Sequence, residues 1–174
     1  MRNILSGLTF LFLLFSSVYA QSHHNFETEK WFGIWQGTLN IYYPVKFIEV
    51  PVTIEINKTN EQGKYSWKTS YDNGKIEKSY FLIVVDAEKG SYILDEDNTI
   101  KLDYYYADNS FYSVFQVEDA ILTSRYTLDK ENLVMEVMSS NFKTPTITGK
   151  DSGEFKEVKS YPVFVTQKAI LTKK

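Results

Sequence analysis

Tyrosine and tryptophan side chains recur at every second position along several stretches, and their chemistry suits a binding site. Alternate side chains of an extended strand share one face, so Tyr65 and Trp67 fall together. A phenol offers an apolar ring with one hydroxyl, which is the mixture that small-molecule sites use. The aromatic residues on the faces that we assign to the interior are the predicted ligand contacts: Tyr65, Trp67, Tyr80, Tyr104, Tyr106, Phe111 and Phe115.

The same aromatic residues have a second interpretation, because a barrel interior can also be completely filled by side chains. In that case they form an ordinary core and no cavity remains. The sequence favours neither a hollow nor a filled interior. Gln116, Gln167 and Glu136 are candidate polar contacts if the interior is hollow.

Residues suited to catalysis or metal binding are sparse. The chain has no cysteine, and its two histidines, His23 and His24, are adjacent. The commonest nucleophile–base pairs are therefore missing, and no soft ligand is present to complete a metal site with the histidines. Acids such as Asp95 and Asp97 cluster at a turn, where side chains are usually solvated. We predict no catalytic residue, no metal site and no cofactor.

Charge and composition restrict the class of partner. The net charge is −3, and Arg125 is the only arginine after Arg2. Nucleic-acid binding depends on basic patches, so a nucleic acid is not a predicted partner. Aromatic residues make up 16% of the chain, and such residues favour strands.

The N-terminus has the features of a secretory signal peptide. Arg2 precedes an apolar run from Ile4 to Phe15, and Val18-Tyr19-Ala20 is an acceptable cleavage site. We predict a cleaved signal peptide over 1–20, a polar lead-in over 21–30 and a single β-barrel domain over 31–174. The expected location is the periplasm or the outside of the cell, with no integral membrane span after cleavage.

From Trp31 onward the pattern indicates strands separated by turns, with no convincing helix. In Trp31 to Ile41 the residues Trp31, Gly33 and Trp35 share one face, and Asn73-Gly74 is a strong hairpin signal. The predicted strands cover 32–42, 47–57, 64–71, 75–85, 91–94, 99–106, 110–117, 120–128, 133–138 and 161–171.

Ten short strands joined by tight turns predict an all-β fold. An open meander of this length would leave two bare edges, and closure removes them. We therefore predict a closed antiparallel up-and-down β-barrel of about 8–10 strands. Residues 139–160 break the rhythm and form either a loose hairpin or a long loop over an opening.

The lead-in and first strand carry a resemblance to a known group of barrels. Asn25-Phe26 followed by Gly33-Ile34-Trp35 resembles the first signature of the lipocalins, and the Gly-x-Trp is similar to that of the fatty-acid-binding proteins. Both belong to the calycin group of ligand-binding barrels. The resemblance implies that Trp35 plugs the closed end of the barrel and that a late arginine packs across it. Arg125 is the arginine available for that role.

Three functions are considered from these patterns. The first is an exported protein that binds a small hydrophobic or aromatic molecule inside the barrel. The second is a filled barrel that acts as a protein-interaction module at the cell envelope or outside the cell. Its predicted contact residues are the surface side chains Phe32, Ile34, Tyr42, Tyr43 and Tyr112. An enzyme is the third and least favoured possibility.

Overall fold

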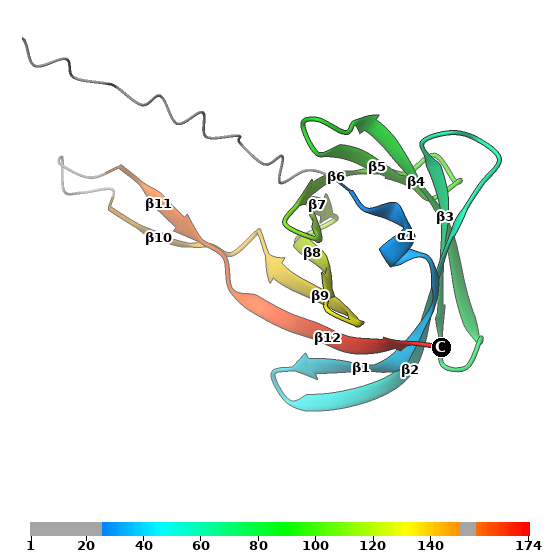
Figure 1. Ribbon diagram of the computed structural model, residues 1–174. Coiled ribbons are helices and arrows are strands. Elements are labelled where there is room, and N and C mark those ends of the chain that lie inside the picture. The colour runs from blue at the N-terminus through cyan, green and yellow to red at the C-terminus, as the bar shows by residue number, and fades with distance from the viewer. Residues whose placement is uncertain (1–25, 150–155) are drawn as a thin grey trace, which may run out of the picture.

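The chain folds into a closed ring of ten antiparallel strands (Figure 1). The structure is a computed structural model that describes residues 26–149 and 156–174. The strands follow the order β1-β12-β9-β8-β7-β6-β5-β4-β3-β2, so β1 closes on β12. The barrel strands are β1 (Gly33–Tyr43), β2 (Lys46–Lys58), β3 (Lys64–Tyr71), β4 (Ile76–Asp86), β5 (Ser91–Asp95), β6 (Lys101–Ala107), β7 (Ser110–Val117), β8 (Ala120–Asp129), β9 (Asn132–Asn141) and β12 (Val163–Lys173).

This arrangement confirms the predicted all-β, closed, up-and-down barrel. Around most of the ring the paired stretches are long, as in the register from Gly33↔Ile56 to Tyr43↔Lys46 between β1 and β2. Pairing is shortest between β6 and β7, where it covers three positions. Beyond those positions the Ser113 hydroxyl donates a hydrogen bond of 2.7 Å to the Asp103 carbonyl.

The segment 139–160 contains a separate hairpin. Strand β9 runs to Asn141, and β10 (Thr146–Thr148) pairs with β11 (Val158–Ser160) as a two-stranded sheet. Figure 1 shows this hairpin extending away from the ring of strands. Of the two alternatives for this segment, the hairpin is therefore the one observed.

A single helical turn, α1 (Thr28–Trp31), precedes the barrel. Figure 1 shows it inside the ring of strands. The expectation that Trp31 shares a strand face with Trp35 was wrong, because the strand begins only at Gly33. Gly33 has φ +122°, a conformation that other residues rarely adopt, and this lets the chain turn sharply from α1 into β1.

The two ends of the barrel differ in how well their inner faces are covered. We call the end beside α1 the closed end, and the opposite end, bounded by turns 44–45, 72–75, 96–100 and 118–119, the mouth. Inner side chains toward the closed end, such as Ile56, Leu82 and Leu171, are at most 1% exposed. Those toward the mouth, such as Ile41 and Val137, are only half-buried.

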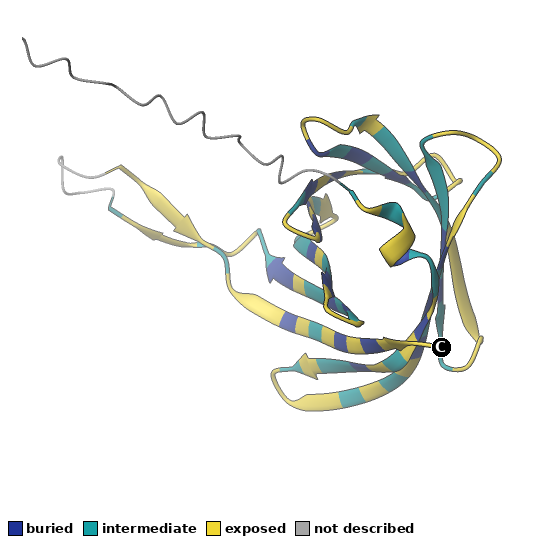
Figure 2. Ribbon diagram, viewed as in Figure 1, coloured by how far each residue is buried: buried dark blue, intermediate teal, exposed yellow. Residues whose placement is uncertain are grey.

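The alternation that predicted the strands appears directly in the burial of each strand. Figure 2 shows buried and exposed residues alternating along β12. In that strand Val165, Ala169 and Leu171 are buried and face inward. Apolar area removed from water stabilises by about 25 cal/mol per Å², so this inner face is the main source of stability.

Candidate functional site

Four tyrosines from four different strands face the interior on the mouth side. They are Tyr71 on β3, Tyr80 on β4, Tyr104 on β6 and Tyr126 on β8. Each lies on the inward phase of its strand, which is set by the buried neighbours two or four positions away. Strand alternation therefore brings together phenols that are far apart in the sequence. We call this group the tyrosine cluster.

The tyrosine cluster rests on Trp67. The rings of Tyr126 and Trp67 meet edge to face at 5.0 Å, and the Tyr104 and Tyr126 centroids are 6.5 Å apart. The Tyr104 hydroxyl shares a hydrogen bond of 2.8 Å with the Ser124 hydroxyl. Trp67 is 3% exposed, so it forms the floor beneath the cluster.

Three hydroxyls of the cluster are free to meet a ligand. Those of Tyr71, Tyr80 and Tyr126 make no hydrogen bond to another described residue, and all three side chains are half-buried. The described ranges contain no buried side-chain N or O atom without a hydrogen-bond partner. These hydroxyls therefore keep some contact with solvent in the mouth half of the barrel interior, which we call the lumen.

The lumen keeps its phenols neutral. Burial raises the pKa of Tyr104 to about 12, although its bond to Ser124 acts in the opposite direction. Burial also raises the pKa of Tyr80, with smaller contributions from Tyr71 and Glu96, and raises that of Tyr126 well above its ordinary value. At neutral pH each hydroxyl can both donate and accept a hydrogen bond.

Below Trp67 the interior is filled with aromatic rings. Phe111 contacts Trp31 at 5.0 Å and Phe26 at 5.1 Å between centroids, and Tyr106 contacts Phe111 at 4.8 Å. Phe26, placed in the predicted polar lead-in, instead packs inside the barrel. These rings therefore pack the interior beside the closed end, and Tyr106 and Phe111 belong to that core.

The two remaining predicted ligand contacts lie toward opposite ends of the barrel. Tyr65 is half-buried near the closed end and contacts Phe26 at 5.7 Å and Phe32 at 5.7 Å. Phe115 is half-buried on the inward phase of β7, toward the mouth. The structure thus places Trp67, Tyr80, Tyr104 and Phe115 along the lumen.

The three predicted polar contacts differ in whether they face the interior or the outer wall. Gln167 lies half-buried on the inward phase of β12. Glu136 faces outward and pairs with Lys168 at 2.9 Å, and Gln116 donates to the Glu118 carbonyl at 3.0 Å. Among the three, Gln167 is the one that faces the interior.

Trp35 lies at the closed end, as the resemblance implies. It is 2% exposed, and its Nε1–H donates a hydrogen bond of 2.8 Å to the Trp31 carbonyl. The cation across its ring is Lys173, whose Nζ is 5.1 Å from the ring centroid. Arg125 instead lies on the outer wall, 5.3 Å from the Tyr112 ring centroid, so the structure does not bring it to Trp35.

The acidic turn 95–98 is organised by local contacts. Asp95 accepts a hydrogen bond from the Asp97 amide and pairs with Lys101 at 3.3 Å. Across the described residues, no group of three or more His, Cys, Asp or Glu side chains is placed to hold a metal ion. The pair His23 and His24, together with the predicted signal peptide over 1–20, lies outside the described residues.

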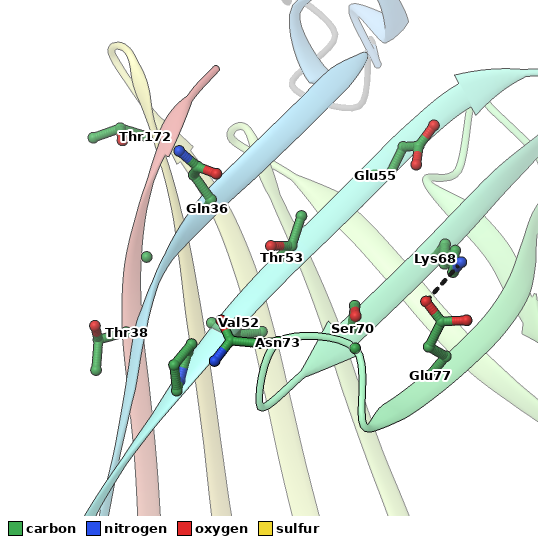
Figure 3. Close-up of a pocket in the computed structure, with 13 residues that line it drawn as sticks. Gln36, Thr38, Val52, Thr53, Glu55, Lys68, Ser70, Asn73, Glu77 and Thr172 are labelled. Carbon is green, nitrogen blue, oxygen red and sulfur yellow. Dashed lines mark ion pairs between the residues drawn. The ribbon is translucent and has the colours of Figure 1, made fainter.

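A groove of about 590 Å³ also lies on the outer wall, across β1, β2 and β3. Figure 3 shows Gln36, Thr38 and Thr53 along it, with the Lys68–Glu77 ion pair of 2.9 Å at one side. Its lining is polar and faces bulk solvent. It has neither the apolar walls nor the enclosure that small-molecule sites generally have, so the lumen is the stronger candidate.

Comparisons with known proteins support the fold alone. No family model and no curated protein matches the sequence. A crystal structure of a protein of unknown function from the DUF3598 family of Nostoc punctiforme is similar, with a TM-score of 0.59 and 12% identity. The match covers 84% of this chain and 48% of that chain, so this chain spans just under half the length of that protein.

Two further observations concern the predictions. The closed antiparallel barrel is the architecture that the resemblance implies, and membership of the lipocalin family itself stays a prediction. Within residues 26–149 and 156–174, no helix has the length and apolar content needed to cross a membrane.

Proposed function

We propose that this protein binds a small hydrophobic or aromatic molecule in the lumen. The observation that supports it is the contrast between the two ends of one barrel. Phe26 and Trp31 pack the interior beside the closed end, whereas the mouth half leaves half-buried rings and three unbonded phenol hydroxyls in contact with solvent. A filled core would cover these groups, because buried polar atoms are normally hydrogen-bonded.

The lining suits an apolar ligand with a few polar atoms. Val50 and Val137 supply apolar wall, Trp67 and Tyr126 supply aromatic faces, and the hydroxyls orient the ligand. Such a mixture of apolar wall and few polar groups is the usual composition of a small-molecule site. The pattern over 1–20 is typical of a secretory signal peptide. We therefore propose that binding takes place in the periplasm or outside the cell.

The test uses a neutral hydrophobic dye, N-phenyl-1-naphthylamine, whose fluorescence rises in apolar surroundings. We expect saturable binding of one dye per protein. Val137→Trp places an indole on the inward phase of β9 and should weaken binding at least tenfold. Val134→Trp places the same indole on the outward phase of β9 and should leave binding unchanged. Equal effects of the two variants, or a signal that never saturates, would reject a site in the lumen.

A protein-interaction role is the second candidate, and one observation favours it. At the β1–β2 hairpin Tyr42 is 51% exposed and Phe47 is 50% exposed, and their rings lie 4.9 Å apart. Of the surface residues predicted for this role, Ile34 and Tyr112 are also exposed, whereas Phe32 and Tyr43 are half-buried. Loss of a co-purifying partner on Tyr42→Ala, with the melting temperature retained, would support this role.

A further inference from the structure

Phe26 lies inside the barrel although it belongs to none of the barrel strands. The ring of strands closes through β1 and β12, and β1 begins only at Gly33. Phe26 enters the interior from the segment that precedes the barrel, and it packs against the core beside the closed end. The wall of the barrel is therefore complete without this residue.

The ring of Phe26 is held in the way that a bound aromatic molecule would be. It meets five other aromatic rings edge to face, at interplanar angles between 63° and 83°. Such contacts are favourable beyond the area they bury, because the positive edge of one ring meets the negative face of another. The five rings, which we call the ring pocket, lie at these centroid distances from Phe26: Phe111 5.1 Å, Tyr106 5.2 Å, Tyr65 5.7 Å, Tyr92 5.7 Å and Trp31 5.9 Å.

The ring pocket overlaps with the ligand contacts that the sequence predicts. Tyr65, Tyr106 and Phe111 belong to that predicted set, and each of them contacts the ring of Phe26. An aromatic group from the chain itself therefore stands where an aromatic ligand was expected.

The segment that carries Phe26 is weakly attached outside the ring pocket. We call Phe26–Lys30 the latch, and its charged side chains are all exposed. The helix α1 within it is a single turn, which is too short to be stable by itself. Glu29 pairs with Lys58 of the barrel at 3.1 Å, but an exposed ion pair contributes little to stability. The contacts of the Phe26 ring are therefore the main attachment of the latch.

Trp31 marks the point at which the latch ends. This residue is 1% exposed, and its carbonyl accepts the hydrogen bond from the Trp35 indole. Withdrawal of the latch would therefore leave both tryptophans in place and would remove one phenyl ring from among the five rings of the pocket.

We propose that the ring pocket is a second ligand site, for a small molecule that carries a phenyl ring, and that Phe26 occupies it until the latch withdraws. The ligand and the latch compete for the same rings, so each weakens the binding of the other by the same factor. The fraction of molecules with a withdrawn latch sets the apparent affinity for the ligand. Trp67 separates this site from the lumen, and the inference does not depend on the proposed function.

The test follows the Phe26 ring itself in the full chain. A para-fluorophenylalanine at position 26 reports docking by fluorine NMR, because the five neighbouring rings shift its resonance away from that of a free side chain. Benzyl alcohol supplies a phenyl ring, and cyclohexylmethanol has a similar size without π-electrons. We expect benzyl alcohol to convert the docked signal to the free signal saturably, at a concentration at least about fivefold lower than cyclohexylmethanol.

Phe26→Ala empties the ring pocket. Benzyl alcohol should raise the melting temperature of this variant at a concentration about tenfold lower than the wild-type protein requires, because no latch ring competes. Phe32→Ala is the matched control, since Phe32 is another half-buried phenylalanine of the same stretch that contacts Tyr65 at 5.7 Å. It keeps Phe26 and should respond as the wild-type protein does.

The wild-type titration decides the inference even if Phe26→Ala fails to fold. A docked signal that persists wherever the protein stays folded, or displacement by both alcohols at one concentration, would overturn it. Equal thermal responses of Phe26→Ala and Phe32→Ala would overturn it as well.

Val137→Trp distinguishes this site from the lumen. Displacement of the Phe26 ring by benzyl alcohol should be unchanged in this variant, and its loss would show that the alcohol acts from the lumen instead. Failure of the dye to bind, with Phe26 still displaced by benzyl alcohol, would reject the proposed function and leave the ring pocket supported.

Discussion

Replacing Trp35 with phenylalanine tests the closed end of the barrel. The indole Nε1–H donates to the Trp31 carbonyl at 2.8 Å, and both residues are at most 2% exposed. Trp35→Phe removes the donor and leaves that buried carbonyl without its partner, which costs about 1–3 kcal/mol. The smaller ring adds a cavity contribution, so we expect the free energy of unfolding to fall by about 2–4 kcal/mol.

The measurement is urea unfolding followed by far-ultraviolet circular dichroism, which does not depend on the lost tryptophan. Trp67→Phe is the matched control, since it makes the same change in ring size at a site 3% exposed and breaks no hydrogen bond with a described residue. Trp35→Phe should be more destabilising than Trp67→Phe by about the 1–3 kcal/mol of the lost bond. If the two variants are equally stable, the hydrogen bond between Trp35 and Trp31 makes no measurable contribution to the free energy of unfolding.

Three further predictions concern stability. Lys173→Ala should lower the free energy of unfolding by about 0.5–1 kcal/mol, because its cation lies over the Trp35 ring, while Lys174→Ala should have no effect in the same urea assay. Gly37→Ala should lower the melting temperature measured by calorimetry, because a Cβ there would lie 2.5 Å from a carbonyl oxygen of β12. Overpacking of this kind costs about 1–3 kcal/mol of stability. An unchanged melting temperature would refute the close approach of the two strands. Burial raises the pKa of Tyr104 to about 12 from an ordinary 10.0. The contribution of the neutral phenol to stability is therefore complete below pH 10 and is lost as the pH rises through the folded-state pKa. Ultraviolet titration should show Tyr104 ionising at a higher pH in the folded protein than in the unfolded chain, and an ordinary midpoint would contradict its buried placement.

The architecture could be predicted from the sequence because alternation carries facing information directly. Val52, Ile54 and Ile56 repeat at a period of two, and all three are buried on the inner face of β2. The turn at Asp72-Asn73-Gly74 was also predictable, because Asn-Gly readily takes positive φ angles. In the structure the φ values of these three residues are 50°, 57° and 92°. Ten strands with tight turns then left closure as the way to remove the edges.

The division of the interior into two halves could not be predicted in the same way. Alternation says which side chains point inward, but not how far along the axis each one lies. Phe26 was assigned to a polar lead-in because its neighbours are polar, yet it closes the core through five aromatic contacts. Tyr71 and Tyr126 shared the correct phase in the sequence, but only the register shows that they reach the open half.

The cation across Trp35 was missed for a related reason. The resemblance pointed to an arginine, and Arg125 was the available one. The position over the indole is set by which strand pairs with β1, and that strand is β12, with Trp35 opposite Lys173. A search for any cation near the end of the last strand would have found it.

The three-position pairing between β6 and β7 has a mechanical consequence. In a ring without edges each strand is held from both sides, so the first local opening should occur where the ladder is shortest. Amide hydrogens of residues 113–117 that point toward β6 should exchange with deuterium ahead of those of β9, which is paired along most of its length on both sides. Such a seam would let the wall widen sideways for a guest too bulky to pass between the turns, while the rest of the cylinder keeps its shape.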